Sequence, residues 1–374
     1  MKTSSHDSKR RAAYFLARTD YFGRPLDDGV IRALLKADFM VDVFMPGDIG
    51  QQSIYPSDVN LLRIDYRAAW LRRHMNPGEW RKYRVFLGTC DLPMAFAGIL
   101  AAISMRPVVT VCDEIYMERQ GPAVRYWKFL SKMGMRRSQF TIIPDLCRST
   151  LQREYARLND KHMFVPYPCS FPAPIEGLNT EAVRQSLGIG EQEFVLSLTG
   201  GFHQFSGAPE AIRLLDRDNS SLCLMIQTGG VPEMVTHELL KKLARNYRVC
   251  YLPERVGWRE AAKIASAGNV GLVFYKSALL DDQTVGLSSQ KLCTFLLLGK
   301  PVVASWQTSF EFIEEFECGV LIKKESDLLG AINRIRQNYM HYANNALRCV
   351  EEYIQPMRKL NALSDKFKEL GQRL

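Results

Sequence analysis

The residue types best suited to hold a phosphate gather in one stretch, DDQTVGLSSQKLCTFLLLGKPVVAS at 281–305. A loop there leads into a short predicted helix, and the loop and first turn carry Gly286, Ser288, Ser289, Gln290 and Lys291. Serine hydroxyls, the unpaired N–H groups of a helix N-terminus and one lysine together form a phosphate cradle. The structural alternative is a serine that caps the helix, followed by a solvated lysine.

Three earlier loops place glycines or polar residues directly after apolar strands, and glycine lets a backbone approach a ligand closely. The first loop, SLTGGFHQFSGAPEAI at 197–212, is neither a Walker loop nor GxGxxG. The candidate donor-binding residues of the three loops are Gly200, Gly201, His203 and Gln204, then Gly229, then Arg255 and Val256. Three such loops in one domain suit an extended ligand such as a nucleotide. Ordinary strand-to-helix connections are the alternative.

Two neighbouring carboxylates, Asp113 and Glu114, follow the apolar stretch PVVTVC at 107–112. The carboxyl end of a strand is where a catalytic general base would stand. Acidic residues at strand ends also cap helices or face solvent, and that alternative stays open.

The elements that must position these residues alternate along the chain between strand and helix patterns. MVDVFMP (40–46) and RVFLGT (84–89) have the pattern of buried strands, whereas MAFAGILAAISM (94–105) has that of a helix. The same alternation restarts at EFVLSLTGG (193–201) and continues to PVVAS (301–305). This predicts an α/β protein with doubly wound parallel sheets, whose ligands bind at the carboxyl ends of the strands.

Between the two runs, FVPYPCSFPAPIE at 164–176 holds four prolines, which suit neither a helix interior nor a central strand. We therefore expect one domain over 1–170 and another over 171–350, followed by a helix over 351–374. A chain of 374 residues is too long for one ordinary core, and 47% hydrophobic with 24% charged residues excludes a disordered chain. The nine scattered cysteines form no CxxC pair, so we expect reduced core residues and no zinc site.

The excess positive charge lies in the first half, where residues 1–170 hold 26 Lys and Arg against 17 Asp and Glu. RIDYRAAWLRRHM (63–75) and WKFLSKMGMRR (127–137) mix basic and aromatic residues, which predicts an anionic membrane contact or ordinary helices with solvated basic faces. The longest weakly polar stretch, 94–105, is too short to span a bilayer. The N-terminus lacks the apolar run of a secretion signal. We expect a cytoplasmic protein, at the inner face of the plasma membrane if the basic patches bind lipid.

The segment SSQKLCTFLLLGKPVVAS (288–305) resembles the donor site of glycosyltransferase family 4, in which a lysine opens a helix that ends in Gly-x-Pro-Val-Val-Ala. ASAGNVGLVFYKS (265–277), ECGVLIKKESDLLGAINRI (317–335) and the first-half segment 87–116 resemble other pieces of that family in the same order. The resemblance implies a GT-B fold with two Rossmann-like domains and an interdomain cleft. The first domain would bind the acceptor, the second the nucleotide-sugar donor, and the last helix would cross back onto the first.

The sequence also departs from the family pattern. The family's two glutamates, with seven residues between them, fall here on Gly286 and Thr294, and the second position implies a donor contact for Thr294. The Arg and Lys of the family's first phosphate loop are absent, with His203 and Gln204 in their place, and a family histidine is replaced by Asp113.

The resemblance implies a glycosyltransferase that uses a nucleotide sugar, a UDP- or GDP-sugar, in the synthesis of a cell-surface polysaccharide or glycolipid. The basic first half suits a lipid-linked saccharide as the acceptor. The donor half has no metal-binding cluster in its sequence, so we expect neither a metal nor a further cofactor. Lys291 and then Arg255 are the expected stabilisers of the leaving diphosphate. The family implies retention of anomeric configuration, and an inverting route with Asp113 as base stays open. A non-catalytic protein that binds a nucleotide sugar or a partner transferase is the alternative. Nucleic acid is not an expected partner, because no RNP, zinc-finger or helix-turn-helix motif occurs.

Overall fold

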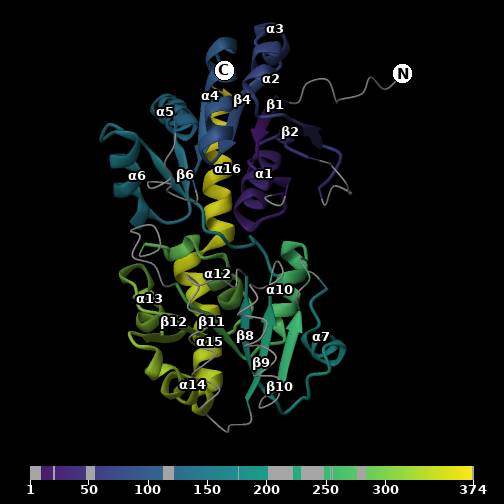
Figure 1. Ribbon diagram of the computed structural model, residues 1–374, viewed down its shortest axis with the longest axis vertical. Helices are drawn as coiled ribbons and strands as arrows, with labels where there is room; N and C mark the ends of the chain where they lie inside the picture. Colours follow the sequence, from purple (N-terminus) through teal and green to yellow (C-terminus); the bar gives the residue numbers. More distant parts are fainter. Residues whose placement is uncertain are drawn as a thin grey trace. The chain divides into compact units, whose positions relative to one another are not determined.

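The computed structural model divides into two compact units (Figure 1). Unit 1 comprises Met1–Pro168 and Met357–Leu374, and unit 2 comprises Cys169–Pro356. The residues that the structure describes are 10–19, 22–47, 55–112, 122–175, 177–200, 222–228, 248–252, 254, 256–275 and 284–372.

Unit 1 is built on a seven-stranded parallel sheet with the order β3-β2-β1-β4-β5-β6-β7. Its strands are β1 (Arg10–Phe15), β2 (Phe39–Met45), β3 (Val59–Arg63), β4 (Tyr83–Thr89), β5 (Val108–Val111), β6 (Thr141–Ile143) and β7 (Phe164–Pro166). The strands are continuous apolar runs because helices bury both faces of a parallel sheet. Aromatic packing closes the core, where Phe15 stacks on Phe44 with ring centroids 4.7 Å apart.

Helices connect most of the strands of unit 1, and two short helices come in succession before β4 (Figure 1). They are α1 (Pro25–Lys36), α2 (Ala68–Arg73), α3 (Pro77–Trp80), α4 (Asp91–Ser104), α5 (Pro122–Arg137), α6 (Ser149–Ala156) and α16 (Pro356–Gln372). Helix α1 begins with proline and has Asp27 and Asp28 in its first turn, both favourable at a helix N-terminus. The last helix begins at Pro356, and its Phe367 ring packs 5.7 Å from that of Phe140.

Unit 2 repeats the plan with a six-stranded parallel sheet of order β10-β9-β8-β11-β12-β13. The strands are β8 (Phe194–Thr199), β9 (Leu222–Gln227), β10 (Arg248–Leu252), β11 (Val270–Val273), β12 (Val302–Ser305) and β13 (Gly319–Ile322). The described helices are α7 (Thr180–Ser186), α10 (Trp258–Ser266), α12 (Gln290–Leu297), α13 (Phe312–Glu315), α14 (Leu328–Gln337) and α15 (Tyr339–Cys349).

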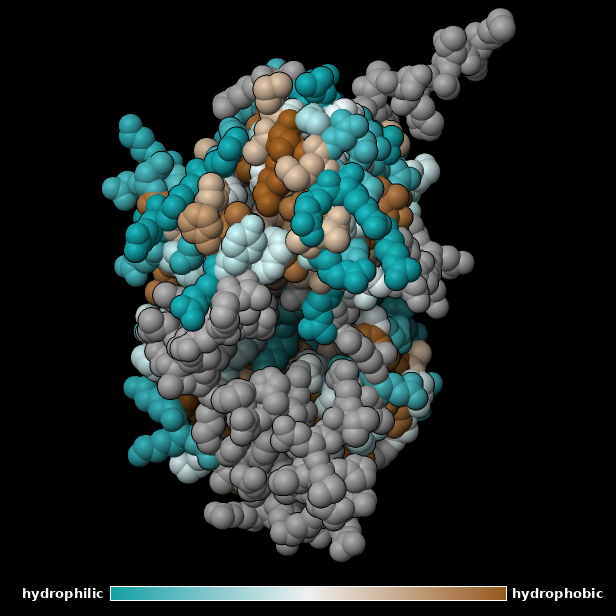
Figure 2. Space-filling model, turned by 45° about the horizontal axis from the view of Figure 1, so that its top comes forward, coloured by the Kyte–Doolittle hydropathy of each residue, from teal (hydrophilic) through white to brown (hydrophobic). Residues whose placement is uncertain are grey.

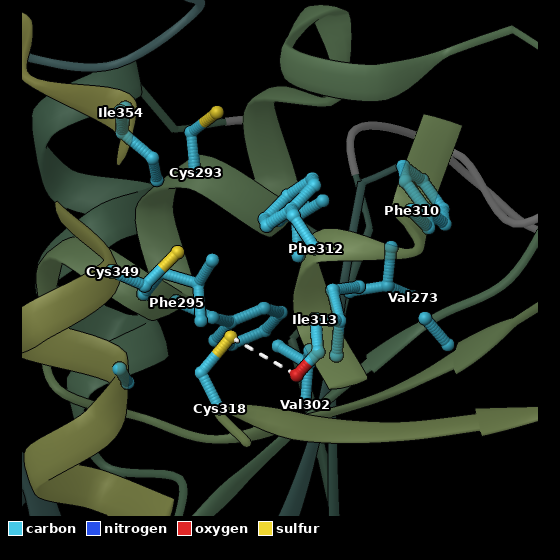
Figure 3. Packing of buried hydrophobic residues seen from close by; sticks show 14 of the residues in the cluster. Val273, Cys293, Phe295, Val302, Phe310, Phe312, Ile313, Cys318, Cys349 and Ile354 are labelled. Carbon is cyan, nitrogen blue, oxygen red and sulfur yellow. Dashed lines mark hydrogen bonds between the residues drawn. The ribbon is translucent and has the colours of Figure 1, made fainter. Parts of the chain in front are cut away.

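Each face of the unit 2 sheet has its own hydrophobic cluster. Along β12, Val303 belongs to one cluster, while Val302 and Ala304 belong to the other, as the two-residue period of a strand requires. Figure 3 shows the second cluster, in which Phe295 of α12 packs beside Val302. The doubly wound arrangement expected from the sequence is therefore present in both halves.

All nine cysteines are reduced thiols, and seven of them are buried. Cys293, Cys318 and Cys349 lie in the cluster of Figure 3, where the Cys318 thiol donates to the Ile313 carbonyl at 3.6 Å. A hydrogen bond with Cys318 and burial raise the pKa of the Cys349 thiol. The expectation of core cysteines fails at Cys147, which is exposed because it lies in a surface turn before α6.

None of the described helices is both long and apolar enough to cross a membrane.

Candidate functional site

The chain reverses its direction of travel across the unit 2 sheet between β8 and β11. From the central β8 it proceeds outward to β9 and β10, then returns to β11 and proceeds the other way to β12 and β13. In open parallel sheets, ligands bind at the carboxyl ends of the strands on either side of such a reversal. This edge is where a ligand of unit 2 would bind.

Gly200 stands at the end of β8, at this edge. Its φ of +94° lies in the region that favours glycine, and its N–H donates to the Gln227 carbonyl at 3.1 Å. Among the described residues, none lies within 4 Å of a Cβ placed on Gly200, so the positive φ is the observed reason for a glycine here. Val256, in the loop after β10, is partly exposed. The predicted residues Gly201, His203, Gln204, Gly229 and Arg255 lie outside the described residues.

The loop before α12 is held by the segment that follows β12. The Gly286 N–H donates to Ser309 Oγ at 3.0 Å, and the Val285 N–H to Gln307 Oε1 at 3.3 Å. Gly286 has a φ of +48°, again a conformation that suits glycine. These contacts fix where α12 begins.

Ser289 is the N-cap of α12. Its Oγ accepts a hydrogen bond from the Leu292 N–H at 3.3 Å and shares one of 2.8 Å with the Tyr275 hydroxyl. The side chain is buried, so its oxygen supports the helix start, as the structural alternative predicts. Its neighbours Ser288 and Gln290 are partly exposed. A donor contact from Ser289 stays a prediction.

Lys291 lies in the first turn of α12, directly beside the end of β11. Its Nζ donates to the Phe274 carbonyl at 3.0 Å and lies 4.2 Å from the centre of the Tyr275 ring. Burial lowers the pKa of Lys291 to about 8. The lysine is thus a positioned cation and not the solvated side chain of the structural alternative. An ammonium has three donors, and Phe274 is its one hydrogen-bond acceptor among the described residues.

Thr294, one turn further along α12, is only 8% exposed. Gly286 is buried as well. The two positions that correspond to the family's glutamates carry a glycine and a threonine, so neither has a carboxylate. Both residues are buried. A donor contact from Thr294 stays a prediction.

In unit 1 the corresponding reversal lies between β1 and β4. The predicted catalytic residues Asp113 and Glu114 lie outside the described residues, directly after the buried Cys112. Their roles stay predictions.

Sequence reasoning missed one carboxylate that follows β4 at the reversal point, Asp91, the first residue of α4. Its Oδ1 accepts hydrogen bonds from Ser131 Oγ at 3.1 Å and from the Tyr155 hydroxyl at 3.4 Å. Burial, and then Asp91, raise the pKa of Tyr155, so the phenol stays a donor. The signal was an acid directly after the strand pattern RVFLGT, but the partners come from α5 and α6, far along the chain.

Comparisons with known proteins agree with this architecture. No protein-family model matches the chain, and no curated protein matches it in sequence. HepE of Anabaena in complex with UDP-glucose has a TM-score of 0.68 and 14% identity, covering 97% of this chain and 100% of that one. A glycosyltransferase from Rickettsia africae gives 0.73 and 9%, covering 98% and 100%. WaaG, a glycosyltransferase involved in lipopolysaccharide biosynthesis, gives 0.67 and 14%, covering 96% and 99%.

At these identities the likeness concerns the fold. Two Rossmann-like units with seven- and six-stranded parallel sheets, matched over almost the full length of such structures, define the GT-B fold. The fold class expected from the sequence is confirmed.

Proposed function

We propose that this chain is a glycosyltransferase that moves a sugar from a nucleotide-sugar donor to a saccharide acceptor. The observation that carries the proposal is the start of α12 at the reversal point of the unit 2 sheet, where the Phe274 carbonyl holds Lys291 Nζ. The similar fold of HepE, whose structure is known in complex with UDP-glucose, supports a nucleotide-sugar donor. A UDP- or GDP-sugar is the proposed co-substrate.

Lys291 has the chemistry that departure of a nucleoside diphosphate requires. Negative charge develops on the leaving phosphates in the transition state, and a fixed cation beside a helix N-terminus stabilises it there. The Phe274 carbonyl and the Tyr275 ring hold the ammonium in place, so little reorganisation is needed when the charge develops. We propose that protein groups supply this stabilisation without a metal.

The acceptor class and stereochemistry belong to the same proposal. A lipid-linked saccharide, used in cell-surface polysaccharide or glycolipid synthesis at the inner face of the plasma membrane, suits the basic first half of the chain. Retention follows the family resemblance, and inversion would require a base such as Asp113. The anomeric configuration of the product, measured by proton NMR coupling, distinguishes the two routes.

A second candidate function is supported by one specific observation. Gly286 and the buried Thr294 occupy the positions where the family carries glutamates, so a protein that binds a nucleotide sugar without transferring it has a structural basis. Such a protein would still bind the nucleotide.

The test is a thermal-unfolding series with UDP, GDP, ADP, CMP and dTDP. A nucleotide present at about 100 times its dissociation constant should stabilise the fold by roughly 2.7 kcal/mol. We expect UDP or GDP to raise the melting temperature of the natural chain and of Lys300→Ala, but not that of Lys291→Ala. Lys300 is a matched control because its pKa is also lowered to about 8, while it lies past the other end of α12. No shift with any nucleotide contradicts both candidate functions.

If a nucleotide binds, release of sugar from its activated form onto saccharide acceptors separates the two candidates. Transfer supports the enzyme, and binding without transfer to any acceptor supports the second candidate.

A further inference from the structure

The segments 63–75 and 127–137 of unit 1 both mix basic and aromatic residues. They differ in whether their aromatic side chains are buried or exposed. Around α2, Leu71 is buried and Trp70 is partly buried, with the Trp70 ring 6.1 Å from Phe96 and 6.2 Å from Trp80. The apolar side chains of 63–75 thus belong largely to the core, and this helix presents mainly Arg67, Arg72 and Arg73.

Helix α5 instead has an apolar face on the surface. Tyr126 is 58% exposed, Phe129 57% and Met133 42%. Their spacing of three and then four residues places them on one face. Among the described helices, α5 alone exposes three large hydrophobic side chains.

The opposite face of α5 is fixed against α4 by a close approach of two glycines. A Cβ on Gly98 of α4 would lie 3.0 Å from the Gly134 Cα of α5, and one on Gly134 would lie 3.0 Å from the Met94 carbonyl oxygen. Ser131 and Met135 are buried on the same side. This packing sets the rotation of the helix, so the outward direction of Phe129 and Met133 is determined by the fold.

Positive charge surrounds the exposed apolar face. The described part of α5 contains no acidic residue, and Arg125, Arg136 and Arg137 are exposed. Lys128, Lys132 and Arg136 lie at four-residue spacing on the side that packs against α6, where Lys128 is buried and Lys132 Nζ lies 4.1 Å from the centre of the Tyr155 ring. Burial, and then the charges of Lys128, Arg157 and Arg136, lower the pKa of Lys132. The cations available to an outside partner are therefore the exposed Arg125, Arg136 and Arg137.

We propose that α5 is a membrane-contact surface, on which Tyr126, Phe129 and Met133 enter the headgroup region of an anionic phospholipid leaflet while the flanking arginines bind its phosphates. Aromatic and apolar side chains at the centre of a cationic helix face are the features that hold a helix in a membrane interface. Figure 2 shows one face of the molecule, on which hydrophobic side chains lie among hydrophilic ones. The proposal rests on the proposed function and deepens it by naming where a lipid-linked acceptor is met.

The test is co-sedimentation of the full chain with vesicles of phosphatidylcholine alone and of phosphatidylcholine mixed with phosphatidylglycerol, with no nucleotide present. The natural chain should bind the vesicles that contain phosphatidylglycerol, and the bound fraction should fall as the salt concentration rises. Removing two cations with R125Q and R137Q together should weaken the partition coefficient about 25-fold, from about fivefold for each cation. F129S should weaken it roughly tenfold.

The matched control is the double variant R72Q and R73Q, which removes the same charge from α2 and should bind almost as well as the natural chain. M340S, which removes an exposed methionine of unit 2, is the control for F129S. Unchanged melting temperatures establish that the variants fold.

Absence of binding at low salt overturns the proposal, and so does equal binding to the two kinds of vesicle. Equal weakening by the α2 and α5 charge variants overturns the assignment to α5. Because no nucleotide is used, failure here leaves the sugar-transfer proposal standing, and a failed nucleotide assay leaves the membrane surface standing.

Discussion

Each unit places a helix start beside the reversal point of a parallel sheet, yet the two starts carry opposite charge. In unit 2, α12 begins with the cap Ser289 and the cation Lys291. In unit 1, α4 begins with Asp91, which accepts hydrogen bonds from Ser131 and Tyr155. A helix N-terminus is itself positive, so Lys291 adds to that field whereas Asp91 offsets it.

The comparison teaches that topology sets the place of a site and side chains set its chemistry. The edge in unit 2 suits an anionic ligand, since it has a positioned cation, Lys291, beside a helix N-terminus. The edge in unit 1 instead has a carboxylate, Asp91, that accepts hydrogen bonds from two hydroxyl groups of the protein.

The largest expected effect follows from removing the cation of unit 2. Lys291→Ala should lower the rate of sugar transfer about 10²- to 10³-fold, the usual loss when one charge-stabilising donor is removed from a transition state. Steady-state kinetics measures it, with Lys300→Ala as the control that should keep full activity. A full transfer rate in Lys291→Ala would show that this lysine has no role in catalysis.

The next effect concerns the acidic start of α4. Asp91→Ala leaves two hydroxyl donors without their acceptor, so we expect the free energy of unfolding to fall by about 1–3 kcal/mol. Urea denaturation measures this change. The matched variant at the other helix start, Ser289→Ala, removes a cap and should cost about 1 kcal/mol. A smaller loss for Asp91→Ala than for Ser289→Ala would contradict the importance assigned to the Asp91 hydrogen bonds.

The smallest effect is a pH dependence specific to unit 2. Burial lowers the pKa of Lys291 to about 8, so its charge is lost as pH rises through that value. Affinity for the selected nucleoside diphosphate should therefore fall about tenfold between about pH 7 and about pH 9, measured by titration calorimetry. Lys291→Arg should show a flat profile because a guanidinium keeps its charge. A flat profile in the natural chain would mean that charged Lys291 does not contact the phosphates.

The lowered pKa of Lys291 also affects folding stability. As pH rises, nucleotide affinity should fall, whereas the free energy of unfolding should increase. Between about pH 8 and the ordinary lysine value of 10.5, the unfolded chain binds more protons at this site than the folded chain does. The contribution of Lys291 to folding stability therefore rises with pH over that window, and below it the cost of burying the charge is fully present.

Much of the fold could be predicted from sequence because its signals are local. Apolar runs bounded by glycine and proline indicated the strands, and the serine before QKLCTFLL indicated the start of α12. The last helix was predicted from 351 but begins at Pro356, because a short π-helix at Val350–Ile354 precedes it. Proline fits the first turn of a helix, and that preference marks the observed start.

The sequence by itself determined the alternation of strands and helices, the charge of each half and the cap of α12, because each depends on residues close together in the chain. Tertiary structure alone decided that Lys291 is held by Phe274 and Tyr275, and that Asp91 meets Ser131 and Tyr155. It also decided that α5 exposes its aromatic face while α2 covers its own. The physical reason is that the burial of a side chain depends on which helices pack together. Here α5 packs on α4 through Gly98 and Gly134, and Trp70 packs against the core of unit 1. Amino-acid composition alone does not determine these contacts.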